Sequence, residues 1–174
     1  ALSQAKRPLM VIGSQTLAQA GQAAAIAQAI GQLGIPVYLS GMARGLMGRH
    51  HPLQMRHQRR DALREADCVV LAGVPCDFRL DYGKHIRRSA RLIAVNRSAR
   101  DARLNRRPDV AVIGDAGLFF LSMAQSGNLW KQRASDWQPW IAQLQARDAQ
   151  RETGIDTQAT VGGTMVNPVA LLRL

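Results

Sequence analysis

Residues 8–39 read PLMVIGSQTLAQAGQAAAIAQAIGQLGIPVYL, and this stretch decides the fold. It opens with a short apolar run, Pro8–Gly13, which is rich in strand formers and is stopped by glycine. From Leu17 to Leu33 small and apolar residues recur at helical spacing, and the following Gly-Ile-Pro ends that helix. Val37–Leu39 is a second short strand. A strand, a helix and a strand with short links predict a parallel pair joined by a right-handed crossover.

The same pattern continues downstream. Three further apolar runs predict strands, and the segments between them predict amphipathic helices. The strands are expected at 68–72, 92–95 and 109–113, and the helices at 54–66, 82–89 and 116–125. Strands with apolar side chains on both faces are covered by helices on both sides. The sequence therefore predicts a doubly wound, open parallel α/β sheet of five to six strands, of the Rossmann-like type.

Residues 1–127 contain this pattern and form the expected core. Residues 128–151 predict a C-terminal helical extension of one or two helices, with Pro139 as an interruption or as a first-turn residue. Residues 152–166 contain Gly, Thr and Gln without periodicity and are expected to be a linker. Residues 167–174 begin with Asn-Pro before an apolar run, which predicts a capped helix at the start of a further domain.

The composition narrows the classes of function. The net charge is +11, but the arginines are spread over three stretches without interleaved aromatic residues, so a nucleic-acid partner is not favoured. We expect this charge to face partner domains, acidic ligands or solvent. No apolar run approaches the roughly 18 residues of a membrane span. Two cysteines, Cys68 and Cys76, form neither a disulfide framework nor a zinc motif, which predicts reduced thiols in the cytoplasm.

In open α/β sheets, ligands bind outside the carboxyl ends of the strands. Most of the loops expected there begin with glycine or a small residue, which lets the backbone approach a ligand closely. These loops are 13–16, 40–48, 73–83, 96–100 and 114–117. The dinucleotide fingerprint and the P-loop motif are both missing, which disfavours a dehydrogenase or an NTPase. The histidines and carboxylates form no recognisable acid/base pair or metal ligand set. The residues thus predict a nucleotide crevice with no catalytic and no metal-binding residue.

A series of short motifs, in order, resembles the central domain of thiamine diphosphate-dependent enzymes. The branch that it resembles contains acetolactate synthase, oxalyl-CoA decarboxylase and 2-hydroxyacyl-CoA lyases. The motifs are RPLMVIG at 7–13, LGIPV at 33–37, MARGLMG at 42–48, HPL at 51–53, ALREADCVVLAG at 62–73, IGDA at 113–116 and NPVAL at 167–171.

This resemblance implies a three-domain enzyme that forms a homo-oligomer, either a dimer or a tetramer. Thiamine diphosphate and Mg²⁺ are then expected between its first and third domains, outside these 174 residues. The parent would be a lyase or carboligase acting on 2-oxoacids or 2-hydroxyacyl-CoA, and this domain alone would be inactive. The central domain holds FAD in acetolactate synthase, and ADP or the CoA nucleotide in the CoA-dependent members.

Carried over residue by residue, the resemblance implies a set of nucleotide contacts. They are Gly73, Val74, Arg79, Asn96, Arg97, Asp115 and Ala116, with Gly41 and Met42 toward the flavin or pantetheine end. Two positions depart from the family pattern. Pro75 stands where the family has arginine, and Asn96 stands where an acidic residue is common. Arg79 or Arg97 is expected to replace the lost phosphate contact.

Two other functions are open at this point. The first is a free-standing adenine-nucleotide-binding or regulatory module of the same fold. The second is a basic nucleic-acid-binding protein, which would show an affinity that falls steeply with salt.

Overall fold

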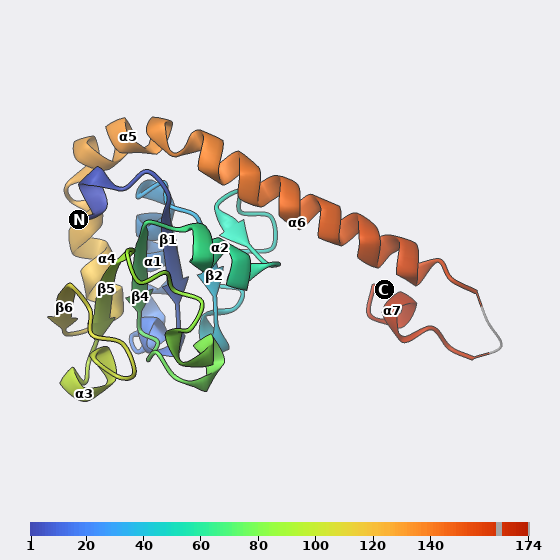
Figure 1. Ribbon diagram of the computed structural model, residues 1–174, viewed down its shortest axis with the longest axis horizontal. Coiled ribbons are helices and arrows are strands. Elements are labelled where there is room, and N and C mark those ends of the chain that lie inside the picture. Colours follow the sequence, from blue (N-terminus) through green and yellow to red (C-terminus); the bar gives the residue numbers. More distant parts are fainter. Residues whose placement is uncertain (163–164, 174) are drawn as a thin grey trace.

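The computed structural model describes residues 1–162 and 165–173, and for residues 127–131 the backbone only. Six parallel strands form one sheet in the order β3-β2-β1-β4-β5-β6 (Figure 1). They are β1 (Pro8–Ile12), β2 (Val37–Leu39), β3 (Gln54–Met55), β4 (Cys68–Ala72), β5 (Arg91–Asn96) and β6 (Val110–Ile113). This is the strand order of a Rossmann fold. Successive strands are added on one side of β1 as far as β3 and then on its other side from β4 onward, so the strand order reverses between β1 and β4. The predicted doubly wound, open parallel α/β fold is confirmed.

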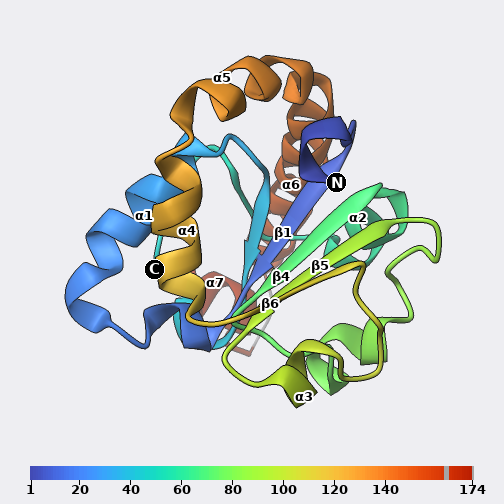
Figure 2. The same ribbon diagram turned by 90° about the vertical axis from the view of Figure 1, so that its left-hand side faces the viewer.

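Helices cover both faces of this sheet. Figure 2 shows α1 and α4 together on one side and α2 on the other. The α-helices are α1 (Ala23–Gln32), α2 (Arg59–Glu65), α3 (Ala99–Ala102), α4 (Ala116–Ala124), α5 (Gly127–Asp136), α6 (Gln138–Ala159) and α7 (Pro168–Leu171). The short 3₁₀ helices are η1 (Leu2–Gln4), η2 (Ser14–Leu17), η3 (Ala20–Gln22), η4 (Gly41–Ala43) and η5 (Phe78–Gly83). Every residue of β1 and β4 is buried, as expected for central strands of a parallel sheet.

The helix predicted from Leu17 to Leu33 is shorter than expected. The chain first makes η2 and η3, and only α1 is regular. Thr16 is fully buried, and its hydroxyl donates to the Ala72 carbonyl at 3.4 Å, which holds the loop down on the sheet. Gln19 then has a non-helical backbone (φ −112°, ψ 77°). The helix therefore begins where these tertiary contacts end.

Two other predicted helices were wrong in part. The segment 54–66 splits into β3, which pairs with β2, and α2, because Gln58 between them is left-handed (φ 52°). No α-helix forms at 82–89. There Asp81 and Tyr82 both have a left-handed backbone (φ 49° and 55°), which leaves only the 3₁₀ turns of η5. The extra helix α3 and strand β3 were not predicted.

The predicted extension forms two helices, α5 and α6, with Pro139 in the first turn of α6. The core does not stop at residue 127, because Trp137, Trp140 and Leu144 are buried in the same cluster as the sheet. Helix α6 runs on to Ala159 and extends away from the sheet (Figure 1), so the first half of the expected linker is helical. Its exposed half has no apolar face, which explains the missing periodicity. Residues 163–164 of that linker lie outside the described residues.

The last helix confirms the predicted cap. The Asn167 side-chain oxygen accepts hydrogen bonds from the backbone N–H groups of Val169 and Ala170, at 2.9 and 3.3 Å. Asn167 also donates to carbonyls at the end of α6. The helix α7 is thereby folded back beside α6 (Figure 1).

Glu152 links α6 to the segment before α2, through His57, and to the end of the chain, through Arg173. Its carboxylate hydrogen-bonds to the His57 ring at 2.7 Å and accepts from Arg173 at 2.7 Å. These two contacts lower the pKa of Glu152 to about 2. A carboxylate with a depressed pKa contributes stability that is present above its unfolded pKa and is lost as the pH falls toward the folded value.

We therefore expect the stability difference between the wild type and Glu152→Gln to depend on pH. The difference should be largest near neutral pH and should shrink as the pH falls from about 5 toward about 2. The measurement is the urea midpoint of both proteins across this range, followed by far-UV circular dichroism. A difference that stays constant over the whole range would contradict this role of the carboxylate.

Candidate functional site

At the carboxyl ends of the central strands, the loops after β1, β2 and β4 meet around a hollow of about 400 Å³. This is the point where the strand order reverses, and we call it the switch-point hollow. The structure brings five of the predicted contact residues together here. They are Gly41, Met42, Gly73, Val74 and Arg79.

Backbone forms the floor of the switch-point hollow. Gly73 has φ +66°, and a Cβ there would lie 2.7 Å from both the backbone nitrogen and the hydroxyl of Thr16. At Gly13 a Cβ would lie 2.6 Å from the Gly73 carbonyl oxygen. The Ser14 hydroxyl accepts from the Met42 N–H at 3.0 Å, which joins the loops after β1 and β2. Only glycine allows these loops to pack so closely, and its lack of a side chain keeps the floor of the hollow clear for a ligand.

Arg79 is the charged side chain of the switch-point hollow. Its guanidinium is ion-paired with Asp77 and lies 4.7 Å from the centre of the Phe78 ring. The Asp77 carboxylate also accepts from the Arg79 backbone N–H at 2.9 Å. These contacts hold a half-exposed guanidinium at the rim, where it can face a phosphate.

The other predicted contacts follow β5 and β6 and do not line the hollow. Asn96 is 1% exposed, and its side-chain nitrogen has no partner among the residues that the structure describes. The Arg97 backbone N–H donates to the Gln15 side chain at 3.3 Å. Asp115 caps α4 by accepting from two backbone N–H groups, and Ala116 is fully buried. In this conformation Asp115 and Ala116 therefore serve the fold, whereas the Arg97 side chain is exposed.

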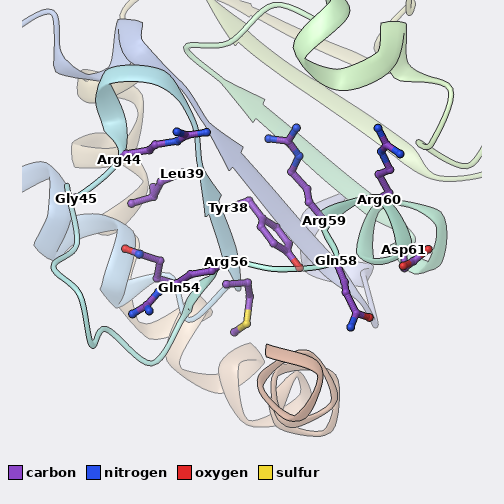
Figure 3. Close-up of a pocket in the computed structure, with 11 residues that line it drawn as sticks. Tyr38, Leu39, Arg44, Gly45, Gln54, Arg56, Gln58, Arg59, Arg60 and Asp61 are labelled. Atoms are coloured by element: carbon purple, nitrogen blue, oxygen red, sulfur yellow. The ribbon is translucent and has the colours of Figure 1, made fainter. Parts of the chain in front are cut away.

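A second hollow, of about 640 Å³, lies beside the first at the ends of β2 and β3 (Figure 3). Its lining includes Arg44 and Arg59, which the sequence reasoning did not select as site residues. The available signal was the arginine-rich stretch 44–64, which stood out only as unexplained charge.

Neither metal nor thiol chemistry is evident in the described part of the chain. It contains no group of three or more His, Cys, Asp or Glu side chains that could hold a metal ion. Cys68 and Cys76 are free and buried, and burial raises the pKa of both thiols to about 11. Such thiols remain protonated and are poor nucleophiles. None of the described helices has the length and apolar character needed to cross a bilayer.

A six-stranded parallel sheet in this order, with a glycine-floored hollow at its switch point, defines a doubly wound α/β domain of the Rossmann-like class. The sequence profile described as "Thiamine pyrophosphate enzyme, central domain" matches residues 1–123. The chain therefore belongs to this family, as the motifs in its sequence predicted.

Known relatives agree with this assignment. The 2-hydroxyacyl-CoA lyase 2 of Bos taurus is 43% identical over 180 residues, which cover 99% of this chain and 28% of that protein. The acetolactate synthase large subunit of Mycobacterium tuberculosis is 34% identical over 161 residues, which cover 89% of this chain and 28% of that protein. The chain thus spans little more than a quarter of the length of these relatives.

A solved structure shares the fold. It is the thiamine diphosphate-dependent 4-hydroxybenzoylformate decarboxylase of Rhodococcus jostii, with a TM-score of 0.51 and 21% identity. The match covers 72% of this chain and 25% of that one. At this level of identity, the likeness establishes the architecture alone.

The name of the family implies thiamine diphosphate, a group whose diphosphate is held through a divalent cation with oxygen ligands. The described residues offer no acidic cluster for such a cation. This chain therefore does not fit thiamine diphosphate by itself, and none of its residues is assigned a step of that chemistry.

Proposed function

We propose that this chain is the non-catalytic central domain of a thiamine diphosphate-dependent lyase or carboligase that acts on 2-oxoacids or 2-hydroxyacyl-CoA. The name of the first relative supports 2-hydroxyacyl-CoA, and 2-oxoacids are what the resemblance to acetolactate synthase implies. Catalysis would then take place in flanking domains of a homo-oligomer. The test is an assay of the protein that carries this chain together with its flanking segments, loaded with thiamine diphosphate and Mg²⁺. A folded protein that neither cleaves 2-hydroxyacyl-CoA nor condenses 2-oxoacids would contradict the proposal.

In this proposal the switch-point hollow binds an adenine nucleotide, namely ADP, FAD or the nucleotide part of CoA. The observation that carries it is the hollow at the reversal of strand order, whose floor is formed by Gly13 and Gly73 and carries no side chain there. Arg79 at the rim is ion-paired with Asp77, and the other N–H groups of its half-exposed guanidinium are donors for a phosphate. The free side-chain nitrogen of Asn96 suits a ribose hydroxyl. Because Asn96 is buried, that contact requires a shift of the loops joined by Gln15.

We expect an adenine nucleotide to raise the melting temperature of the chain, because a ligand of the folded state stabilises it by mass action. At a hundred times Kd, the gain is about 2.7 kcal/mol. For a chain of this size, that gain corresponds to roughly 5–10 °C. The measurement is a thermal melt with ADP, FAD or coenzyme A. Arg79→Gln should reduce the shift, whereas Arg87→Gln, which removes an exposed charge elsewhere, should retain it.

Two outcomes would contradict nucleotide binding at the switch point. One is a melting temperature that none of the three ligands changes. The other is a shift of equal size in the wild type and in the Arg79→Gln variant.

A further inference from the structure

The larger hollow at the edge of the sheet is separate from the switch-point hollow. It lies between the end of β2, the segment around Arg44, strand β3 and the start of α2 (Figure 3). Its volume is about 640 Å³, and it shares no lining residue with the switch-point hollow. We call it the arginine pocket, after Arg44, Arg59 and Arg60 in its lining.

The charge of the arginine pocket is unbalanced. Within the described ranges, the guanidinium groups of Arg44, Arg59 and Arg60 have no carboxylate within ion-pair distance. The carboxylate of Asp61, which also lines the pocket, is engaged by Arg64 at 2.9 Å. Three guanidinium groups therefore line one space together with a single carboxylate that is already paired.

A fourth arginine of the lining behaves differently. Arg56 donates to the Arg49 carbonyl and lies 3.7 Å from Glu152, so its charge is already matched. In Figure 3 its guanidinium lies on the side of Gln54, whereas Arg44 extends toward Arg59 above Leu39 and Tyr38. The lining thus contains one arginine that is paired with a carboxylate and three that are not.

Arg59 is held in place at the centre of this group. Its Nη2 donates to the Arg79 carbonyl at 2.7 Å, and the side chain is only partly exposed. Burial, followed by repulsion from Arg44 and Arg60, lowers the pKa of Arg59. Arginine remains charged even so, and the repulsion is relieved when an anion enters. The Gln54 side chain lines the same space, and its oxygen has no partner in the part of the chain that the structure describes.

We infer that the arginine pocket is a binding site for a phosphate or diphosphate group. A single carboxylate would neutralise one of the three free guanidinium groups, whereas a diphosphate carries enough charge and acceptor oxygens for all of them. Guanidinium groups bind such oxygens through paired N–H donors. The Gln54 oxygen is buried and unpartnered, and it becomes an acceptor for a hydroxyl group of the same ligand once the side chain turns into the pocket.

Two sources could supply this phosphate: a nucleoside diphosphate or the phosphates of coenzyme A. Because the pocket is lined by its own residues, the inference does not depend on nucleotide binding in the switch-point hollow. The bond from Arg59 to the Arg79 carbonyl does connect the two hollows, so one extended ligand could occupy both.

The test is calorimetric titration of the 174-residue chain with inorganic pyrophosphate, which has no adenosine to bind at the switch point. Three proteins are compared: the wild type, Arg44→Gln/Arg59→Gln, and the matched control Arg87→Gln/Arg151→Gln. Both double variants lose two positive charges, but the control positions are exposed and lie outside the pocket. We expect the pocket variant to weaken pyrophosphate binding about a hundredfold and the control to change it less than about threefold.

Competition then identifies the source. Displacement of pyrophosphate by ADP would indicate that the ligand is a nucleoside diphosphate. Displacement by coenzyme A but not by ADP would indicate that the ligand is the phosphates of coenzyme A. Three results would overturn the inference: no pyrophosphate binding to the wild type at low salt, equal affinity of the pocket variant, or an equal loss in the control. Failure of the switch-point proposal looks different, because the ADP-induced shift is then equal in the wild type and in Arg79→Gln while pyrophosphate still binds.

Discussion

Replacing Trp140 with alanine is expected to lower the free energy of unfolding by about 3–5 kcal/mol. The indole is 3% exposed, and its N–H donates to the Pro8 carbonyl at 2.9 Å. Alanine would leave a large cavity under α6 and a carbonyl without its donor. The measurement is urea unfolding followed by far-UV circular dichroism. The free energies of wild type and variant are compared with a common m-value, the slope of the free energy of unfolding against urea concentration.

Two further variants separate the causes. Trp140→Phe keeps most of the buried ring but loses the N–H donor, so a smaller cost of about 1–3 kcal/mol is expected. Leu172→Ala changes an apolar side chain that is 87% exposed near the same end of the chain, and it should stay within about 0.5 kcal/mol of the wild type. If Trp140→Ala were as mild as Leu172→Ala, then α6 would not belong to the core.

Trp137, the N-cap residue of α6, and Trp140, in the first turn of α6, hold this helix against the N-terminal segment. The Trp137 N–H donates to the Ala5 carbonyl and the Trp140 N–H to the Pro8 carbonyl, both at 2.9 Å. Each bond joins residues that are 132 positions apart in the sequence. The sequence indicated helices here, but it could not indicate where they pack. An indole donor does not reveal which distant carbonyl it will meet.

The sequence predicted best where the local pattern and the tertiary environment agree. Strands β1, β4 and β5 are apolar runs that are buried on both faces, and so they resemble nothing else in the chain. The predicted strands also determine which loops lie at the carboxyl ends of the sheet. Gly41, Gly73 and their neighbours could therefore be assigned to one crevice before their geometry was known.

The features that could not be predicted from the sequence depend on contacts between distant residues, which a local sequence pattern does not contain. Strand β3 has two residues and exists because Gln54 and Met55 pair with β2. That pairing also brings Arg59 of α2 opposite Arg44 of the loop after β2. Without β3 the segment was interpreted as one helix, and the arginine pocket could not be predicted. Asn96 was predicted as a ligand contact, but no local signal revealed that it would be buried.

Replacing Gly73 with alanine is expected to destabilise the fold by about 2–5 kcal/mol, and two other glycines separate the causes. At Gly73 the backbone is left-handed and a Cβ would lie 2.7 Å from Thr16 atoms, so both strain and overlap contribute. Gly45 is also left-handed (φ +92°), but a Cβ there meets nothing within 4 Å. Gly13 has an extended backbone, and its Cβ would only clash with the Gly73 carbonyl and with Val74.

We therefore expect Gly45→Ala to cost only the backbone strain, about 1–2 kcal/mol, and Gly13→Ala to cost only the overlap, about 1–3 kcal/mol. The measurement is urea unfolding of all three variants. A cost at Gly73 near the sum of the other two would show that the loops after β1 and β4 touch as described. A cost at Gly73 equal to that at Gly45 would mean that they do not. The floor of the switch-point hollow would then not be packed as described, and its shape would not be fixed for a nucleotide.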